Sequence, residues 1–496
     1  MEVWFIFIVS LCISALVKFI CSLLLSSTKK KNLPPGPTSI PLIGNLIWLC
    51  KPISDLEFVL RSLKPRYGPL ITLMIGHRPF IFVGSRSIAH RALIGSGGAF
   101  SDRPAPTPTQ RIFNKTGIAI SSSLYGPTWR LLRRNLMHEI LHPSRVRLYS
   151  TSRRRALSVL VNPLRSDSSS PVRLTDHFRY AMFCLLVLMC FGDDNVEENQ
   201  IKEMEGVLRS LLLGSRRFNV LNMWPRLGKI VFRKRWKELI QLRQDWDKVL
   251  IPLIRACLQS NLTIRKTDHE VAVAYVDTLV DLQIPGEVYG SRKLDEDEMV
   301  GLCTEFLSAG TDTTSATLQW IMANLVKYPR IQDKLYQEII QEDDLQKMPY
   351  LKAVVLEALR RHPPGHFVLP HKVTRADVEL DGYAIPENAV VNFMVADMGW
   401  DPQVWEDPME FKPERFLGET FDVTGSREIK MMPFGAGRRI CPASALALLH
   451  LEYFVANLIW NFEWTSPQGH EIDLSEKQEF STVMKNPLHA CISPRM

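Results

Sequence analysis

The residues best suited to chemistry lie in one short loop, Phe434-Gly435-Ala436-Gly437-Arg438-Arg439-Ile440-Cys441-Pro442. Gly435 and Gly437 allow a tight turn that side chains would block. Pro442 suits the first turn of the helix predicted for the apolar run that follows. The sulfur of Cys441 would then meet backbone N–H groups and the positive end of a helix, which favour thiolate over thiol. This arrangement predicts a metal ligand.

A cysteine on a loop is also commonly a buried structural thiol. The neighbours of Cys441 favour the ligand, because Phe434 would cover the sulfur, Gly437 supplies the turn and Arg439 places a cation beside it. The nine cysteines of the chain show no paired spacings, which indicates reduced, cytosol-facing thiols rather than a disulfide framework.

A second group of reactive side chains lies in residues 294–328, a long stretch that predicts a helix. Its centre reads Ala309-Gly310-Thr311-Asp312-Thr313-Thr314. Ala309 and Thr313 share a face, and the small residues Ala309 and Gly310 would let a flat ligand pack closely. A glycine costs about 1 kcal/mol within a helix, so Gly310 needs such a compensation. The Thr313 hydroxyl can donate to the carbonyl four residues earlier and loosen the helix there.

Two further pairs have helical spacing. Trp129 and Arg133 lie one turn apart, so an indole N–H and a guanidinium can together bind a carboxylate. The alternative is a solvated face rich in arginine. Glu357 and Arg360 have the spacing of a surface ion pair, which contributes under about 1 kcal/mol.

The elements that position these residues are mostly helical from about residue 85 onward, and strands return near 372–385 and at the C-terminus. Before them, residues 70–75 and 80–83 alternate apolar and polar side chains around the turn Gly76-His77-Arg78-Pro79, which predicts a β-hairpin. We therefore expect a mainly α-helical fold with a small β region.

The N-terminus predicts a membrane anchor. Residues 3–25 are almost wholly apolar, which is about the length that spans a bilayer, and the lysines at 29–31 place the rest of the chain in the cytosol. A cleaved signal peptide is the alternative, but here the charges follow the apolar run. The expected parts are an anchor helix at 1–27, a basic and proline-rich hinge at 28–45, and one large catalytic domain at 46–496.

Composition excludes some functions. The net charge of +8 over 496 residues is modest and dispersed, and no basic stripe with interleaved aromatics indicates nucleic acid. An anionic membrane surface or an acidic protein partner suits the charge better. Residues 218–236 mix apolar and basic side chains, which suits the headgroup zone, with core packing as an equal alternative. No GxGxxG follows a predicted strand, so we expect no flavin or nicotinamide site.

Taken together, these motifs resemble those of the cytochromes P-450, and most closely those of plant A-type members of the family numbered 89. The resembling segments follow that family's order: the anchor, the proline hinge, WxxxR at 129–133, AGTDTT at 309–314, ExxR at 357–360, PERF at 413–416 and the cysteine loop. The resemblance covers essentially the whole chain. It implies the cytochrome P-450 fold, with haem b (iron protoporphyrin IX) between the 294–328 helix and the cysteine loop.

The resemblance also implies a role for each matching residue. Cys441 would be the axial ligand of the haem iron. The other residues at the haem would be Phe434, Gly437, Ala309 and Gly310, with Trp129, Arg133, His371 and Arg439 at its propionates. Asp312 would relay protons from solvent, and Thr313 would hold O2 and its water. Glu357, Arg360 and Arg415 would form a buried structural network behind the cysteine loop.

The implied reaction inserts one oxygen atom from O2 into a lipophilic small molecule. Electrons would come from the NADPH-cytochrome P-450 reductase of the same endoplasmic reticulum membrane, docking where Arg133, Arg134 and Arg438 offer positive charge. The chain would cross that membrane once, with its catalytic domain in the cytosol.

Two other functions remain open. One is an O2-independent haem-thiolate isomerase or dehydratase, although the intact pair Asp312 and Thr313 argues against it. The other is a non-catalytic haem-binding membrane protein. Three departures from the family pattern bear on that reading. Ala443 replaces the usual glycine two residues after the ligand, Trp400 stands where Arg or His is usual, and the segment from Tyr336 to Asp344 is shorter than in relatives.

Overall fold

The computed structural model describes residues 4, 7, 9–18, 32–39, 45, 53–75, 78–166, 171–193, 195–223, 225–263, 272–286, 290–342, 344–418 and 420–495. These residues divide between two compact units. Unit 1 takes its residues from Met1–Pro104, His366–Met398 and Asp422–Arg439, and unit 2 takes its residues from Ala105–Gly365, Gly399–Phe421 and Ile440–Met496. That residues 46–496 act as one catalytic domain stays a prediction.

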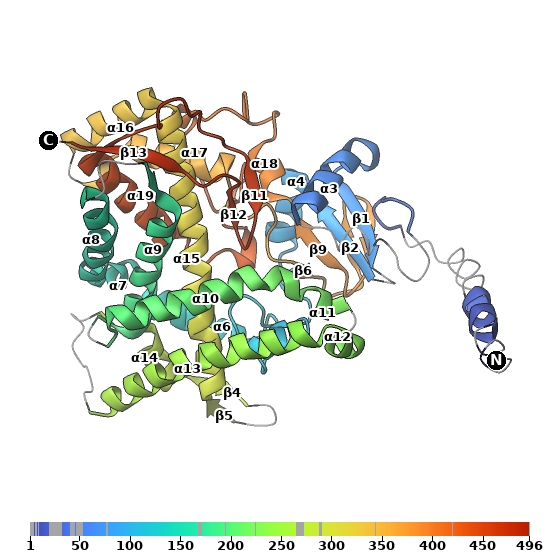
Figure 1. Ribbon diagram of the computed structural model, residues 1–496. Coiled ribbons are helices and arrows are strands. Elements are labelled where there is room, and N and C mark those ends of the chain that lie inside the picture. The colour runs from blue at the N-terminus through green and yellow to red at the C-terminus, as the bar shows by residue number, and fades with distance from the viewer. Residues whose placement is uncertain are drawn as a thin grey trace. The chain divides into compact units, whose positions relative to one another are not determined.

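Unit 1 is built on a four-stranded sheet in the order β1-β2-β9-β6 (Figure 1). Strands β1 (Leu70–Ile75) and β2 (Arg78–Val83) form the predicted antiparallel hairpin. Arg78 belongs to β2 rather than to the turn, and residues 76 and 77 lie outside the described part. Strand β9 (Val390–Phe393) pairs parallel to β2, and β6 (His371–Lys372) pairs antiparallel to β9.

The remaining elements of unit 1 pack around this sheet. They are α3 (Ile53–Tyr67), α4 (Arg86–His90), the π-helix η1 (Arg91–Gly95), the hairpin of β7 (Val378–Leu380) and β8 (Tyr383–Ile385), α18 (Val395–Gly399), whose last residue belongs to unit 2, and the 3-10 turn η5 (Gly437–Arg439).

Unit 2 is organised on α15 (Glu296–Lys327), the long yellow helix of Figure 1. Asp295 caps its first turn: the Asp295 side chain accepts from the Glu298 N–H, and the Glu298 side chain accepts from the Asp295 N–H. Most α15 side chains between Leu307 and Val326 are buried, as expected of a helix that is apolar almost all round. The predicted helix at 294–328 is thus confirmed.

Helix α9 (Leu174–Phe191) packs along α15. In the described part of the chain it is the one helix long and apolar enough to span a membrane, and 72% of it is buried. Because its apolar surface is covered by neighbouring helices, α9 serves as a core helix of this unit.

The other elements of unit 2 are chiefly helices with short strand pairs. They are α5 (Gln110–Phe113), α6 (Pro127–Asn135), η2 (Leu136–Ile140), α7 (Pro143–Leu148), α8 (Ser150–Ser166), β3 (Val172–Arg173), α10 (Glu198–Phe218), α11 (Val220–Met223), α12 (Pro225–Val231), α13 (Arg233–Thr263), α14 (Tyr275–Val280), β4 (Gln283–Pro285), β5 (Ser291–Lys293), α16 (Pro329–Gln341), η3 (Leu345–Lys347), α17 (Pro349–Arg361), η4 (Pro413–Phe416), α19 (Ser444–Asn461), β10 (Phe462–Thr465), β11 (Glu476–Gln478), β12 (Thr482–Met484) and β13 (His489–Pro494).

The predicted anchor and hinge fall largely outside the described residues. Val9–Lys18 forms an apolar helix shorter than a membrane span, and its Leu11 side chain is 64% exposed. Residues 32–39 of the hinge have no regular secondary structure, as their prolines require. A transmembrane helix at 1–27 therefore stays a prediction.

Candidate functional site

The glycines of the cysteine loop adopt the conformations that the sequence predicts. Gly435 and Gly437 have φ of 70° and 71°, a region that side chains disfavour. A Cβ on Gly437 would lie 2.2 Å from the Leu93 carbonyl oxygen of η1, so the loop approaches that backbone more closely than any other residue allows. The position predicted for Pro442 is wrong, because α19 begins at Ser444, two residues later.

Cys441, in unit 2, is largely enclosed by protein. Burial raises the pKa of its thiol, while the backbone N–H of Ala443 and the guanidinium of Arg133 lower it. The sequence correctly predicted that backbone N–H groups favour the thiolate, but it missed that burial outweighs them. A bound metal cation would supply the remaining stabilisation of the thiolate.

Helix α6 carries the Trp and Arg pair. Gly126 is its N-cap and Pro127 opens its first turn. Trp129 is buried, and its indole N–H donates to the Ile120 carbonyl at 2.9 Å. The Arg133 guanidinium carbon lies 5.5 Å from the centre of the Trp129 ring, which confirms that the two side chains share a face. A carboxylate bound here would have to share the indole N–H with Ile120.

His371 lies in unit 1, on strand β6, and is buried. Burial lowers the pKa of His371 to about 3, and the charges of Arg103 and Arg439 act in the same direction. The neutral ring pairs its Nδ1 with the Phe100 carbonyl at 2.5 Å, so Nδ1 carries the proton and Nε2 is an acceptor. The predicted contact to a propionate therefore requires the imidazolium form of His371.

The two arginines beside His371 are also buried and have backbone partners. Nε of Arg439 donates to the Ser101 carbonyl at 2.7 Å. Arg103 donates to the Leu369 and Pro370 carbonyls at 2.8 and 2.9 Å. These bonds fix two cationic side chains within unit 1, and Arg103 was not anticipated from the sequence.

The predicted face of α15 is present. Ala309 is exposed, its neighbours Ser308 and Gly310 are half-buried, and the Thr313 hydroxyl donates to the Ala309 carbonyl at 2.8 Å, as predicted. Gly310 lacks a side chain for a reason other than the predicted packing of a flat ligand, because a Cβ there would lie 2.8 Å from Cδ1 of Leu186 on α9. Its lack of a side chain therefore serves helix packing.

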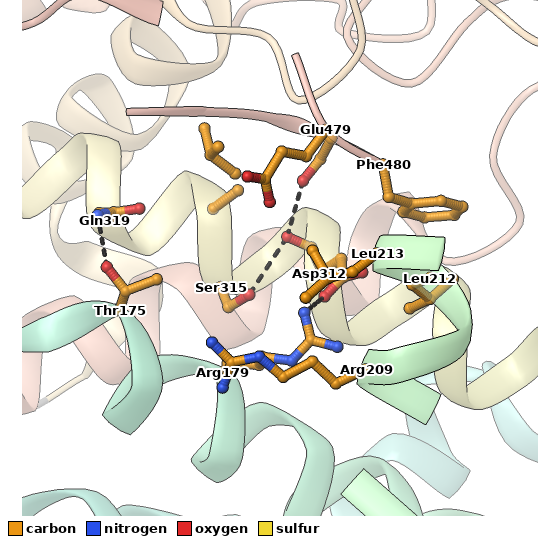
Figure 2. A pocket seen from close by; sticks show the side chains of 13 residues that line it. Thr175, Arg179, Arg209, Leu212, Leu213, Asp312, Ser315, Gln319, Glu479 and Phe480 are labelled. Carbon is orange, nitrogen blue, oxygen red and sulfur yellow. Dashed lines mark hydrogen bonds and ion pairs between the residues drawn. The ribbon is translucent and has the colours of Figure 1, made fainter. Parts of the chain in front are cut away.

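Asp312, the neighbour of Thr313 in the chain, lines a cavity of about 70 Å³ (Figure 2). Its carboxylate forms an ion pair with Arg179 of α9, and Arg179 also lies 2.8 Å from a carboxylate oxygen of Glu205. Burial raises the pKa of Asp312, Arg179 opposes this, and the charge of Glu205 adds to it. Other residues that line the cavity are Thr175, Arg209, Leu212, Leu213, Ser315, Gln319, Glu479, Phe480 and Ser481.

The structure brings together the three residues of the predicted network. Arg360 Nε lies 2.7 Å from Glu357, and both side chains are fully buried. Arg360 also donates to the Gly399 and Pro408 carbonyls at 2.7 Å. Nε of Arg415 lies 3.4 Å from Glu357. The predicted surface ion pair is thus a buried one, and the network reading is the one that fits.

The departure at Trp400 has a structural explanation. Its indole N–H donates to the Arg361 carbonyl at 2.9 Å, and the Arg361 guanidinium lies 5.4 Å from the ring centre. Tryptophan therefore has its own hydrogen bond and cation–π contact at this position.

Sequence reasoning missed three charged residues that the structure places near the candidate groups: Arg103, Arg179 and Glu305. Arg179 and Glu305 are charges within largely apolar helices, α9 and α15. A charge in a buried helix needs a partner, and that is the signal by which they could have been found. Their partners are far away in sequence, so the sequence alone could not predict which residues these partners are.

In the described part of the chain, no cluster of three or more His, Cys, Asp or Glu side chains is arranged to hold a metal ion. A metal bound through Cys441 would therefore have to bring most of its own ligands. An iron porphyrin does so, and the one thiol of the cysteine loop, which is half-buried, fits it as the protein ligand.

Comparison with known proteins identifies the family of this chain. The family described as Cytochrome P450 matches residues 34–492, so this chain belongs to the cytochrome P450 family, a class of haem monooxygenases. It is 48% identical to Cytochrome P450 89A9 of Arabidopsis thaliana over 98% of this chain and 99% of the relative, which confirms the predicted likeness to the plant family numbered 89. It is also 31% identical to a costunolide synthase of Cichorium intybus over 97% of both chains.

Solved structures show the same fold. A zebra fish cytochrome P450 structure with progesterone matches with a TM-score of 0.73 and 22% identity, over 89% of this chain and 99% of that chain. The predicted mainly helical fold with small sheets is confirmed. Family membership also implies a haem iron cofactor, a redox partner and a small-molecule substrate.

Proposed function

We propose that this chain is a membrane-bound haem-thiolate monooxygenase that inserts one oxygen atom from O2 into a lipophilic small molecule, with electrons from an NADPH-dependent reductase. The observation that carries the proposal is Cys441, a half-buried thiol held after a glycine turn that tolerates no side chain at Gly437. When bound, haem b supplies the iron at which O2 is activated, and the Cys441 thiolate donates electron density that favours O–O cleavage.

Each unit, taken by itself, has cationic side chains that suit a carboxylate group. In unit 2, Arg133 lies beside Cys441 and on the same face as Trp129. In unit 1, Arg103 and Arg439 are buried next to His371. A carboxylate bound in unit 1 would raise the pKa of His371 and favour its imidazolium form, which can donate from both nitrogens.

Protons are managed by two neighbouring residues of α15. Asp312 is a buried carboxyl group whose raised pKa lets it hold and release a proton in the cavity that Ser481 also lines. The Thr313 hydroxyl is oriented by its bond to the Ala309 carbonyl, which leaves the oxygen lone pairs as acceptors. Asp312 thus takes up protons, and Thr313 presents an oriented hydroxyl on the neighbouring face.

Surface features support the proposed membrane attachment and the proposed redox partner. Residues 1–27 provide the proposed endoplasmic reticulum anchor. In the 218–236 segment, Ile230 and Val231 are 75% and 60% exposed, which suits contact with lipid headgroups, whereas Leu221 is buried. Arg134 is exposed on α6 and offers positive charge to an acidic reductase.

The test is turnover of the purified full-length chain with a cytochrome P450 reductase in phospholipid vesicles. We expect NADPH and O2 consumption that a lipophilic substrate stimulates, and about 100-fold lower turnover in Asp312→Asn, because general acid catalysis is lost. Glu296→Gln is the control and should leave turnover unchanged, since it removes a carboxylate of α15 that is paired with the exposed Arg255. Turnover without O2 would instead identify an isomerase or dehydratase, and electron uptake without substrate-stimulated O2 use would identify a haem-binding protein.

A further inference from the structure

A carboxylate that the proposed reaction does not use holds a loop against α15. Oε2 of Glu305 accepts a hydrogen bond from the Ile120 N–H at 2.8 Å, and Oε1 accepts one from the Ser121 N–H at 2.6 Å. Two successive backbone donors therefore meet the two oxygens of one carboxylate. Hydrogen bonds to an ionised acceptor are roughly twice as strong as neutral ones.

The same segment is bound on its other side by α6. The Ile120 carbonyl accepts the indole N–H of Trp129 at 2.9 Å. One stretch of backbone, residues 119–123, thus connects α15 to the helix that carries Arg133.

Within the segment, the Ser123 hydroxyl accepts from the Ala119 N–H at 2.9 Å and donates to the Gly117 carbonyl at 3.0 Å. Gly117 has φ of 74°, which lets the chain turn there. The segment is therefore compact in itself, and the Glu305 carboxylate binds it to α15.

The position of Glu305 gives this contact its significance. Glu305 lies one helical turn, about 6 Å, before Ala309, on the same face of α15. On the α6 side, Trp129 lies one turn before Arg133, whose guanidinium interacts with Cys441. The segment at 119–123 therefore borders, within unit 2, the residues to which the proposed haem chemistry is assigned.

We propose that Glu305 is a positioning residue that latches residues 119–123 against α15, and that release of this latch admits bulky molecules to the α15 face of Ala309 and Thr313. The part that concerns admission rests on the proposed function. Two acceptor oxygens are required, because Ile120 and Ser121 both present donors. A glutamine at this position would set its own NH2 group against one of the two N–H groups.

The direct test is amide hydrogen exchange of the full-length chain in detergent, with Glu305→Gln compared with wild type. We expect exchange at the Ile120 and Ser121 amides to become at least tenfold faster. Glu296→Gln is the matched control, because it makes the same charge change on α15 but removes an exposed pair with Arg255. Unchanged exchange at Ile120 and Ser121, or equal acceleration along all of α15, would overturn the latch.

Glu305→Asp keeps the result decisive if the glutamine variant does not fold. Aspartate retains the charge but is one methylene shorter, so it can reach one N–H group rather than both. We expect faster exchange at one of the two amides and wild-type exchange at the other. Wild-type exchange at both amides would contradict the proposal.

Ligand entry tests the admission step. Imidazole and 1-phenylimidazole bind haem iron through the same nitrogen but differ in bulk, and stopped-flow absorbance gives their association rates. We expect Glu305→Gln to raise the association rate of 1-phenylimidazole at least fivefold and to change that of imidazole less than twofold. Glu296→Gln should change neither association rate. Equal effects on both ligands would overturn the admission step. A wild-type chain without haem would instead contradict the proposed function. The amide-exchange experiment would still test whether Glu305 holds residues 119–123 against α15.

Discussion

At the residue scale, the sequence identifies side chains by type and spacing but does not give their environment. The Thr313 to Ala309 bond and the contact between Trp129 and Arg133 follow from helical spacing and are present. The raised pKa of Cys441 and the neutral state of His371 were not predictable, because both result from burial by distant segments. Burial by itself favours the uncharged form of each group.

The buried pair of Glu357 and Arg360 gives a prediction at this scale. Glu357→Gln leaves the Arg360 guanidinium buried without a counter-charge, so we expect unfolding to become about 3–5 kcal/mol easier. Glu410→Gln removes an exposed partner of Lys412 and should cost under about 1 kcal/mol. Guanidinium unfolding of the two variants measures the difference, and similar midpoint shifts would contradict a structural role for the buried pair.

At the element scale, long helices were predictable because their signals are local. Acids at the start of α15 and the proline after its end fixed its limits to within about two residues. The sequence could not show why residue 310 must be glycine, since the atom that excludes a side chain there belongs to Leu186 of α9. The start of α19 was placed wrongly because Pro442 is compatible with a helical first turn but does not require one.

The roles of the two glycines of the cysteine loop, Gly435 and Gly437, can be distinguished by experiment. Both have positive φ, so alanine should cost about 1–2 kcal/mol at either one. At Gly437 the added Cβ would also lie 2.2 Å from the Leu93 carbonyl oxygen, whereas at Gly435 the nearest atom is 3.8 Å away. We expect Gly435→Ala to keep most of its haem and Gly437→Ala to lose most of it, as measured by haem per polypeptide. Equal retention would show that the close approach to η1 is unimportant.

At the scale of the whole molecule, composition and motif order were sufficient to predict the mainly helical fold and the family. Local patterns could not reveal the parallel pairing of β2 with β9, because these strands are about 300 residues apart in the chain. Nor could they reveal the division into two compact units, which depends on long-range packing. Buried titratable groups also act at this scale, since their pKa values determine how stability depends on pH.

Acid should destabilise the chain partly through His450 of α19. Burial lowers the pKa of His450 to about 3, so between pH 6.5 and 3 the unfolded chain binds a proton there that the folded chain does not. Stability from this group is present above pH 6.5 and is lost as pH falls. Between pH 7 and 5.5 the loss should be about 1 kcal/mol.

Glu452, nearby on α19, acts in the opposite sense. Burial raises the pKa of Glu452 to about 7, so its contribution grows as pH falls below 7. His450→Gln isolates the histidine: in denaturant unfolding at pH 7 and 5.5, this variant should lose about 1 kcal/mol less than wild type. An identical pH dependence in the two proteins would show that His450 is not held neutral.

The central claim is that the Cys441 thiolate is the iron ligand, and the absorbance spectrum of the reduced protein under carbon monoxide tests it most directly. We expect the wild-type chain to bind haem and to show the red-shifted Soret band of a thiolate-ligated carbonyl complex. Cys441→Ser should lose that band, because a serine hydroxyl does not provide a thiolate. Retention of the band in Cys441→Ser, or a purified wild-type chain without haem, would contradict the account.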